Sequence, residues 1–196
     1  MAVPPPTPHP APDATARAAK AMVRAAVRQA RDNHVGQSSP GLAAPPEFLA
    51  LLRPGLAVAG YIPLGSEASP ATLLAAASAA GCRIALPHVT SRRAPMRFLE
   101  WMLGSPLHDG MLGLSQPPAD AAELAPDIIL TPLLAFDTDL NRLGQGAGFY
   151  DRAFATLPDA IRIGIAWSVQ QIAQVPVDAW DVPLNAIITE KGWMTR

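Results

Sequence analysis

An apolar run, a turn and a glycine-rich loop follow one another between residues 128 and 157, and this stretch limits the possible folds more than any other. Residues 128–134 are almost continuously apolar, which is typical of a strand buried on both faces. Glycines then occupy alternate positions at Gly144, Gly146 and Gly148, and residues 149–157 have helical spacing. This order predicts a phosphate site, because loop N–H groups and the unpaired amides of a helix start can face the same anion.

Charged side chains flank the glycines. Arg142 comes before them and offers a forked cation to phosphate oxygens. Asp151 follows them, where a carboxylate could hold magnesium against those phosphates. The alternative is a tight strand-to-helix turn with surface charges, and the glycines alone do not separate the two readings.

Length and composition indicate one globular domain, or one domain with a tail. The chain has 196 residues and is 49% hydrophobic, with a net charge of -1. That charge argues against a protein that binds nucleic acid through bulk electrostatics. The single cysteine, Cys82, excludes an internal disulfide. No apolar run approaches the ~20 residues of a membrane span, and no signal peptide is visible, so we expect a cytoplasmic protein.

The N-terminal region divides into a tail and a helix. Residues 1–14 are rich in proline, and we expect them to be disordered. The helix that follows, to about residue 33, carries a stripe of cations within a sector of roughly 80°: Arg17, Lys20, Arg24, Arg28 and Arg31. A second sector is predicted to face the core: Met22, Val23, Ala26, Val27 and Ala30. A stripe of one sign repels itself, so it indicates either an anionic partner or a solvated basic face.

The middle of the chain predicts a βαβ unit with a strand at 56–62, a helix ending near Gly81 and a strand at 83–86. Ligands of open α/β sheets collect beyond the carboxyl ends of the strands. Glu67 lies just beyond such an end, as a loop carboxylate or as a ligand group. Farther on, Phe98 and Trp101 could stack on a flat heterocycle or pack in the core.

The whole central string is more specific than its glycines. Ala-Phe-Asp at 135–137, Asn-Arg-Leu-Gly at 141–144 and Gly-Ala-Gly-Phe-Tyr-Asp-Arg at 146–152 resemble the signature of 5-formyltetrahydrofolate cyclo-ligases, also called methenyltetrahydrofolate synthetases. The resemblance extends over about residues 15 to 192. It implies a three-layer α/β/α fold of the NagB/RpiA/CoA-transferase type, with a largely parallel central sheet. Residues 15–196 would then form a single domain, which we expect to be monomeric.

The resemblance also implies the reaction. ATP and magnesium would be required to convert 5-formyltetrahydrofolate into 5,10-methenyltetrahydrofolate, with release of ADP and phosphate. A formamide oxygen is a poor leaving group, and transfer of the γ-phosphoryl group to it makes it a good one. For such a transfer the protein mainly has to position the two substrates and neutralise the charge of the phosphates.

Site residues follow from the same resemblance. The residues expected to bind ATP are Lys20, Arg24, Arg142, Leu143, Gly144, Gln145, Gly146, Ala147, Gly148, Phe149 and Tyr150. Those expected to bind the folate are Ile62, Glu67, Gln145, Gly146, Ala147, Gly148 and Phe149, with Phe98 and Trp101 added as possible stacking partners. The expected magnesium ligands are Asp151 and Asp181.

Three positions depart from the family pattern. Leu140 stands where glycine is usual, Ala147 where glycine or lysine is usual, and Gln116 where an acid is common. Leu140 therefore predicts a rearranged turn after Asp137, and Ala147 requires a φ below zero. The alternatives to the enzyme are a non-catalytic folate or nucleotide binder of the same fold and a relative of the sugar-phosphate isomerases or CoA-transferases.

Overall fold

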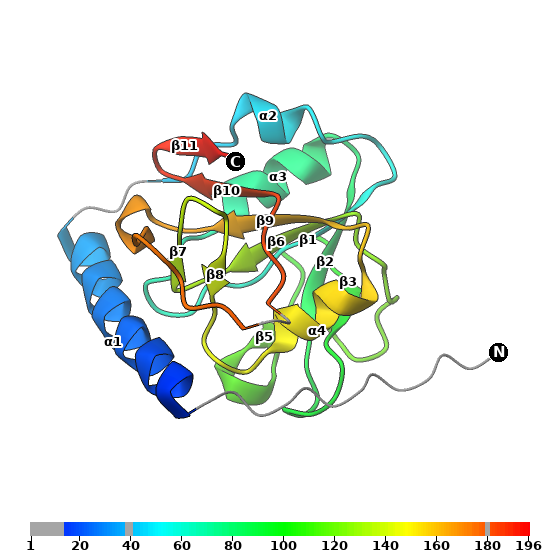
Figure 1. Ribbon diagram of the computed structural model, residues 1–196. Coiled ribbons are helices and arrows are strands. Elements are labelled where there is room, and N and C mark those ends of the chain that lie inside the picture. Colours follow the sequence, from blue (N-terminus) through cyan, green and yellow to red (C-terminus); the bar gives the residue numbers. More distant parts are fainter. Residues whose placement is uncertain (1–13, 38–40, 179–180) are drawn as a thin grey trace.

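The central element is a mixed sheet, seen in a computed structural model that describes residues 14–37, 41–178 and 181–196. The sheet has seven strands in the order β11-β10-β9-β6-β1-β2-β3 (Figure 1). In chain order they are β1 (Ala57–Ala59), β2 (Arg83–His88), β3 (Arg97–Glu100), β6 (Ile128–Pro132), β9 (Ile161–Ile165), β10 (Ala186–Thr189) and β11 (Gly192–Met194). Only the edge strands β3 and β11 pair in the antiparallel sense, which confirms a largely parallel sheet. The tail predicted for residues 1–14 lies, except for its last residue, outside the described residues.

Helices cover both faces of the sheet and give the three layers. On one face, α3 (Ala71–Ala79) buries Leu73 and Leu74 against Val58 and Ile128, and the short α2 (Pro46–Leu49) adds Phe48. On the other face, α4 (Phe149–Thr156) buries its apolar side against strands β6 and β10. The two apolar clusters are separated by the strands, as expected for parallel strands that are buried on both sides.

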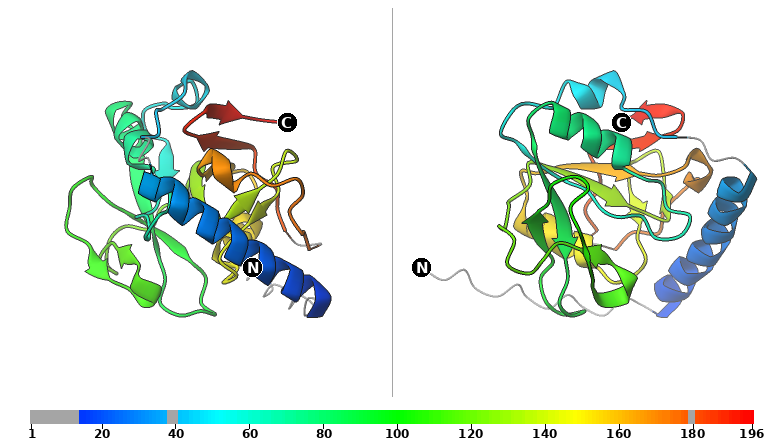
Figure 2. Two further views of the ribbon diagram at one scale, coloured as in Figure 1. Left: turned by 90° about the vertical axis from the view of Figure 1, so that its left-hand side faces the viewer. Right: turned by 180° about the vertical axis from the view of Figure 1, so that it is seen from behind.

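The long helix α1 (Ala14–Gln37) runs along the outside of this body (Figure 2). It rests on the 3-10 helix η2 (Ser168–Gln170) and on the small hairpin of β7 (Ala135–Phe136) and β8 (Arg142–Leu143). Val27 is buried there, but Met22 is 75% exposed and Ala26 is also exposed. The predicted inward face was therefore only partly right, since Val23 and Val27 pack inward and Met22 and Ala26 do not. Lys20, Arg24 and Arg31 also turn inward, because loop carbonyls and carboxylates lie beneath the helix.

The order of the strands creates a crevice. From β1 the chain proceeds outward through β2 to β3, and it then returns to add β6 on the other side of β1. Ligand sites of open α/β sheets form where the strand order reverses in this way, beyond the carboxyl ends. A second small hairpin, β4 (His108–Asp109) and β5 (Ser115–Gln116) with the 3-10 helix η1 (Met111–Gly113) between them, lies near β2.

The turn after Asp137 keeps a glycine-type backbone. Leu140 has φ 61, in the left-handed region, although its side chain is only 2% exposed. The Asp137 carboxylate accepts hydrogen bonds from the N–H groups of Asp139 and Asn141, both at 3.0 Å, and from Val175 N–H at 2.9 Å. A leucine is thus held in a conformation that normally favours glycine.

Candidate active site

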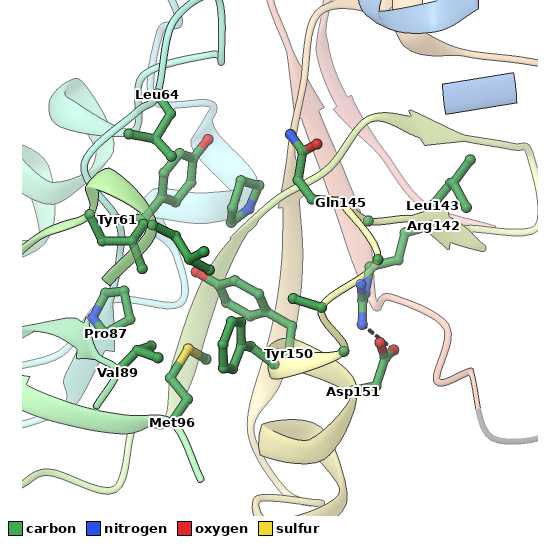
Figure 3. A pocket seen from close by; sticks show the side chains of 18 of the residues that line it. Tyr61, Leu64, Pro87, Val89, Met96, Arg142, Leu143, Gln145, Tyr150 and Asp151 are labelled. Carbon is green, nitrogen blue, oxygen red and sulfur yellow. Dashed lines mark hydrogen bonds and ion pairs between the residues drawn. The ribbon is translucent and has the colours of Figure 1, made fainter. Parts of the chain in front are cut away.

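A cavity of about 750 Å³ lies at the reversal point of the sheet, beyond the ends of β1, β2 and β6. The glycine loop forms its floor and α1 forms part of its wall. Figure 3 shows a polar side, where Arg142 and Asp151 face each other, and an apolar side with Pro87, Val89 and Met96. Most residues predicted for the site line this cavity: Lys20, Arg24, Ile62, Glu67, Asp151, Asp181 and every residue from 142 to 150.

Glycine is required at two of the three loop positions. Gly146 has φ 99 and Gly148 has φ 67, which a side chain rarely adopts. Gly144 does not have a positive φ. Among the non-glycine residues that the structure describes, only Leu112 and Leu140 have a positive φ, so Ala147 meets the condition set for it. The loop leads directly into α4, whose first-turn amides lie next to the cavity.

Helix α1 contributes cations that are already paired. Lys20 Nζ lies 2.6 Å from Asp178 Oδ2 and 2.9 Å from Asp181 Oδ2. Burial opposes the charge on Lys20, but the hydrogen bonds and charges of the two carboxylates prevail and raise its pKa. Arg24 Nε donates to the Gly144 carbonyl at 2.9 Å, and burial lowers the Arg24 pKa. The Arg24 contact attaches the first half of α1 to the glycine loop, and the Lys20 contacts attach it to Asp178 and Asp181.

Arg142 and Asp151 form a second pair, in which Arg142 Nη2 donates to Asp151 Oδ1. The guanidinium is buried and lies 4.9 Å from the centre of the Phe154 ring. Its Nε has no hydrogen-bond partner among the described residues. A buried guanidinium with an unused donor is well placed to bind an added anion.

The centre of the cavity contains two tyrosines and Glu67. Burial raises the pKa of Tyr61 well above its usual range, and the charge of Glu67 raises it further. Burial also raises the pKa of Tyr150, again helped by Glu67. Both phenols therefore remain protonated and can donate hydrogen bonds, but they do not serve as bases. Tyr61 donates to the Ala68 carbonyl, and this hydrogen bond fixes its ring just beyond the end of β1.

Two predicted residues lie elsewhere. Phe98 is 3% exposed and packs in the core beneath the sheet, and Trp101 donates from Nε1 to the Ser105 carbonyl at 3.0 Å. Neither lines the cavity, because Phe98 of β3 and Trp101 just after it pack against the two apolar clusters of the core. The aromatic rings that do line it belong to Tyr61, Phe149 and Tyr150.

Sequence reasoning missed several lining residues. Asp178, which shares Lys20 with Asp181, lies three positions earlier in the same loop, and this spacing was a usable signal. The apolar wall was also missed, although part of it follows from the rule that strand ends face the ligand. Its members are Leu64, Pro87, Val89, Met96, Leu112, Leu114 and Pro132.

The carboxylates suit a magnesium ion only together with phosphate. Among the described residues, no group of three or more His, Cys, Asp or Glu side chains could hold a metal. Magnesium commonly takes one or two protein carboxylates and completes its shell with substrate phosphates and water. Asp151 and Asp181 provide such oxygens in the same cavity, each beside a cation that could move to a phosphate.

Comparison with known proteins identifies the same family over most of the chain. The family model described as 5-formyltetrahydrofolate cyclo-ligase family matches residues 14–190. The 5-formyltetrahydrofolate cyclo-ligase of Escherichia coli strain K12 is 33% identical over 148 residues, or 69% of this chain and 79% of that protein. The Haemophilus influenzae cyclo-ligase is 37% identical over 97 residues, which cover 46% of this chain and 52% of that protein.

A solved structure gives the same result for the fold. The 5,10-methenyltetrahydrofolate synthetase of Aquifex aeolicus, determined by NMR, superposes with a TM-score of 0.68 at 25% identity. The superposition covers 90% of this chain and 92% of that one. Separately, none of the helices in the described ranges is long and apolar enough to cross a membrane.

Proposed function

Because the chain belongs to the 5-formyltetrahydrofolate cyclo-ligase family, it converts 5-formyltetrahydrofolate to 5,10-methenyltetrahydrofolate with ATP, and we propose that the reaction takes place in this cavity. The proposal rests on the meeting of three cations and the glycine loop in one cavity. Lys20, Arg24 and Arg142 meet the glycine loop at one cavity, whose opposite wall is apolar. Such a two-sided space can hold a triphosphate beside a flat heterocycle.

We place the nucleotide at the polar side. The three cations would neutralise the phosphates, and N–H groups of the loop at residues 144–150 and of the first turn of α4 would donate to phosphate oxygens. Lys20 and Arg142 are paired with carboxylates. Phosphates that bind here would replace those carboxylates as the partners of the two cations.

We place the pterin between Glu67 and the apolar wall. The Glu67 carboxylate can accept hydrogen bonds from ring N–H groups, and Ile62 lies beside it at the end of β1. Met96 and Val89 offer the flat apolar surface that the ring and the benzoyl group need. Residues 145–149 then lie at the boundary between the two substrates.

The chemistry is a phosphoryl transfer followed by ring closure. The formyl oxygen attacks the γ-phosphorus and the bond to ADP breaks. Nitrogen 10 then attacks the activated carbon and loses its proton, and the formyl oxygen departs as phosphate. The protein contributes mainly alignment and charge neutralisation in both steps.

Asp151 and Asp181 would hold magnesium together with phosphate oxygens. A magnesium ion bound there neutralises charge on the phosphates and keeps them aligned. Arg142, when released by Asp151, would turn its unused donors toward the γ-phosphoryl oxygens.

A coupled assay on the purified chain tests the proposal. Methenyl absorbance should rise in step with ADP, and only when both 5-formyltetrahydrofolate and ATP are present. Binding of both ligands without turnover would favour a non-catalytic relative, and turnover that ignores ATP would favour an isomerase.

A variant tests the metal role. We expect Asp151→Asn to lower kcat on the order of 100-fold, the effect of losing one preorganised electrostatic group. The amide can still accept a hydrogen bond from Arg142, so folding should be largely retained. Asp139→Asn, at an exposed acid in the same motif, is the matched control. Equal loss of folded protein and of activity in Asp151→Asn would count against a metal ligand.

A further inference from the structure

The cationic stripe of α1 divides into two halves that contact different sides of the cavity. Lys20 and Arg24 contact Asp178, Asp181 and the Gly144 carbonyl, on the side proposed for phosphates. Farther along the helix, Arg28 and Arg31 contact the side on which Glu67 lies. The function described above uses only the first half.

Glu67 accepts hydrogen bonds from two donors and lies near a third, cationic group. Leu64 N–H donates to its Oε2 at 3.0 Å, and Gln145 Nε2 lies 3.3 Å from its Oε1. Arg31 Nη1 lies 4.0 Å from the same Oε1. That guanidinium nitrogen is buried and makes no hydrogen bond among the described residues, while Arg31 Nε donates to Ser66 Oγ at 2.8 Å. Arg31 is therefore anchored beside Glu67, with an unused donor nitrogen 4.0 Å from its carboxylate.

Gln145 connects Arg28 to Glu67 through its two amide atoms. Arg28 Nη2 donates to Gln145 Oε1 at 2.8 Å, and Gln145 Nε2 then faces the Glu67 carboxylate. The opposite orientation of the amide would place its N–H groups against a guanidinium and its oxygen against a carboxylate. Arg28 therefore selects the orientation in which Gln145 can donate to Glu67.

We propose that Arg28 and Arg31 are positioning residues for the folate, Arg28 acting through Gln145 and both acting on Glu67. The inference rests on the proposed placement of the pterin at Glu67. Helix α1 then has a nucleotide half and a folate half, and each half supports the binding of one substrate.

Separate Michaelis constants test this division. Arg28 is exposed, so Arg28→Met should fold normally. We expect its KM for 5-formyltetrahydrofolate to rise about 3- to 10-fold, the effect of losing one hydrogen bond. Its KM for ATP should change less than about twofold. Lys20→Met should raise the KM for ATP instead, and Arg53→Met, at an exposed arginine away from the cavity, should change neither.

A double-mutant cycle tests the route through the amide. If Arg28 acts through Gln145, then Arg28→Met should have little further effect in a Gln145→Met background. Additive effects would overturn the route, and an equal rise in both Michaelis constants would overturn the division. The variant Arg31→Lys tests the second arginine by the same Michaelis constants. If that variant does not fold, the Arg28→Met result decides whether the division holds.

Equilibrium binding separates this inference from the proposed function. Titration of 5-formyltetrahydrofolate without nucleotide should show the same weakening in Arg28→Met. If the wild-type chain does not turn over at all, the proposed function fails. If it turns over and the Arg28→Met chain binds folate as tightly as wild type, only the positioning role fails.

Discussion

Leu140 offers a test of how the central turn is stabilised. A non-glycine residue in the left-handed region is strained by about 1–2 kcal/mol. The side chain compensates by burial in the core on the α4 side, with Phe136, Ile187 and Leu184 in the same cluster. The Leu184 N–H also donates to the Leu140 carbonyl at 3.0 Å, so the turn is hydrogen-bonded to the segment just before β10.

These opposing effects predict how the stabilities of Leu140→Ala and Leu140→Gly compare. Leu140→Ala should destabilise the protein by about 2–5 kcal/mol, because it removes buried methyl groups and keeps the strained backbone. Leu140→Gly loses one more carbon, worth about 0.8 kcal/mol, and makes the unfolded chain freer by about 0.4–1 kcal/mol. It also relieves about 1–2 kcal/mol of strain. These effects nearly cancel, so glycine and alanine at this position should give about the same stability, within about 0.8 kcal/mol.

The control is a buried leucine in an ordinary helix. Leu74 in α3 is 3% exposed and its N–H donates to the Pro70 carbonyl at 2.9 Å. There glycine should be worse than alanine by about 1 kcal/mol. Urea unfolding followed by circular dichroism gives the four free energies of unfolding. If glycine is also about 1 kcal/mol worse than alanine at position 140, burial alone governs the turn and the strain argument is wrong.

Two further predictions concern the loop and a carboxylate near η2. Gly148→Ala should destabilise by about 1–2 kcal/mol because of its left-handed backbone, whereas Gly144→Ala, at an ordinary φ, should be nearly neutral by thermal unfolding. Burial opposes the charge on Glu190, but hydrogen bonds from the Ser168 N–H and hydroxyl outweigh it, so the pKa of Glu190 is lowered. Glu190→Gln should therefore lose about 1–2 kcal/mol at pH 7. The difference from wild type should fade as pH falls below the usual glutamate range, and a difference that is constant with pH would contradict the assignment.

The glycine loop could be predicted because its constraints are local. A strand, glycines needed for positive φ at 146 and 148 and a helix start all lie within about 30 residues, so their periods and spacings are visible in the sequence. The parallel sheet was predictable for the same reason, since its strands are apolar runs. The hairpins β4–β5 and β7–β8 were not, because two-residue strands have no periodicity to detect.

The orientation of α1 could not be predicted from its own residues. Periodicity identified the cationic stripe correctly, and the rule that apolar sectors face the core then pointed to Met22 and Ala26, which are exposed. That rule assumes an apolar docking surface. The surface beneath α1 is instead made of a carbonyl at Gly144, an amide at Gln145 and the carboxylate of Asp178, which come from segments more than 100 residues away.

Two of the cations that line the cavity are paired with carboxylates. Lys20 is shared by Asp178 and Asp181, and Arg142 is paired with Asp151, so each of these cations has a partner, as burial demands. A nucleotide with magnesium offers those groups new partners of opposite sign: phosphates for the cations and a metal for the carboxylates. Binding then exchanges ion pairs rather than burying new charge, and this lets a small cavity accept a triphosphate beside an apolar wall.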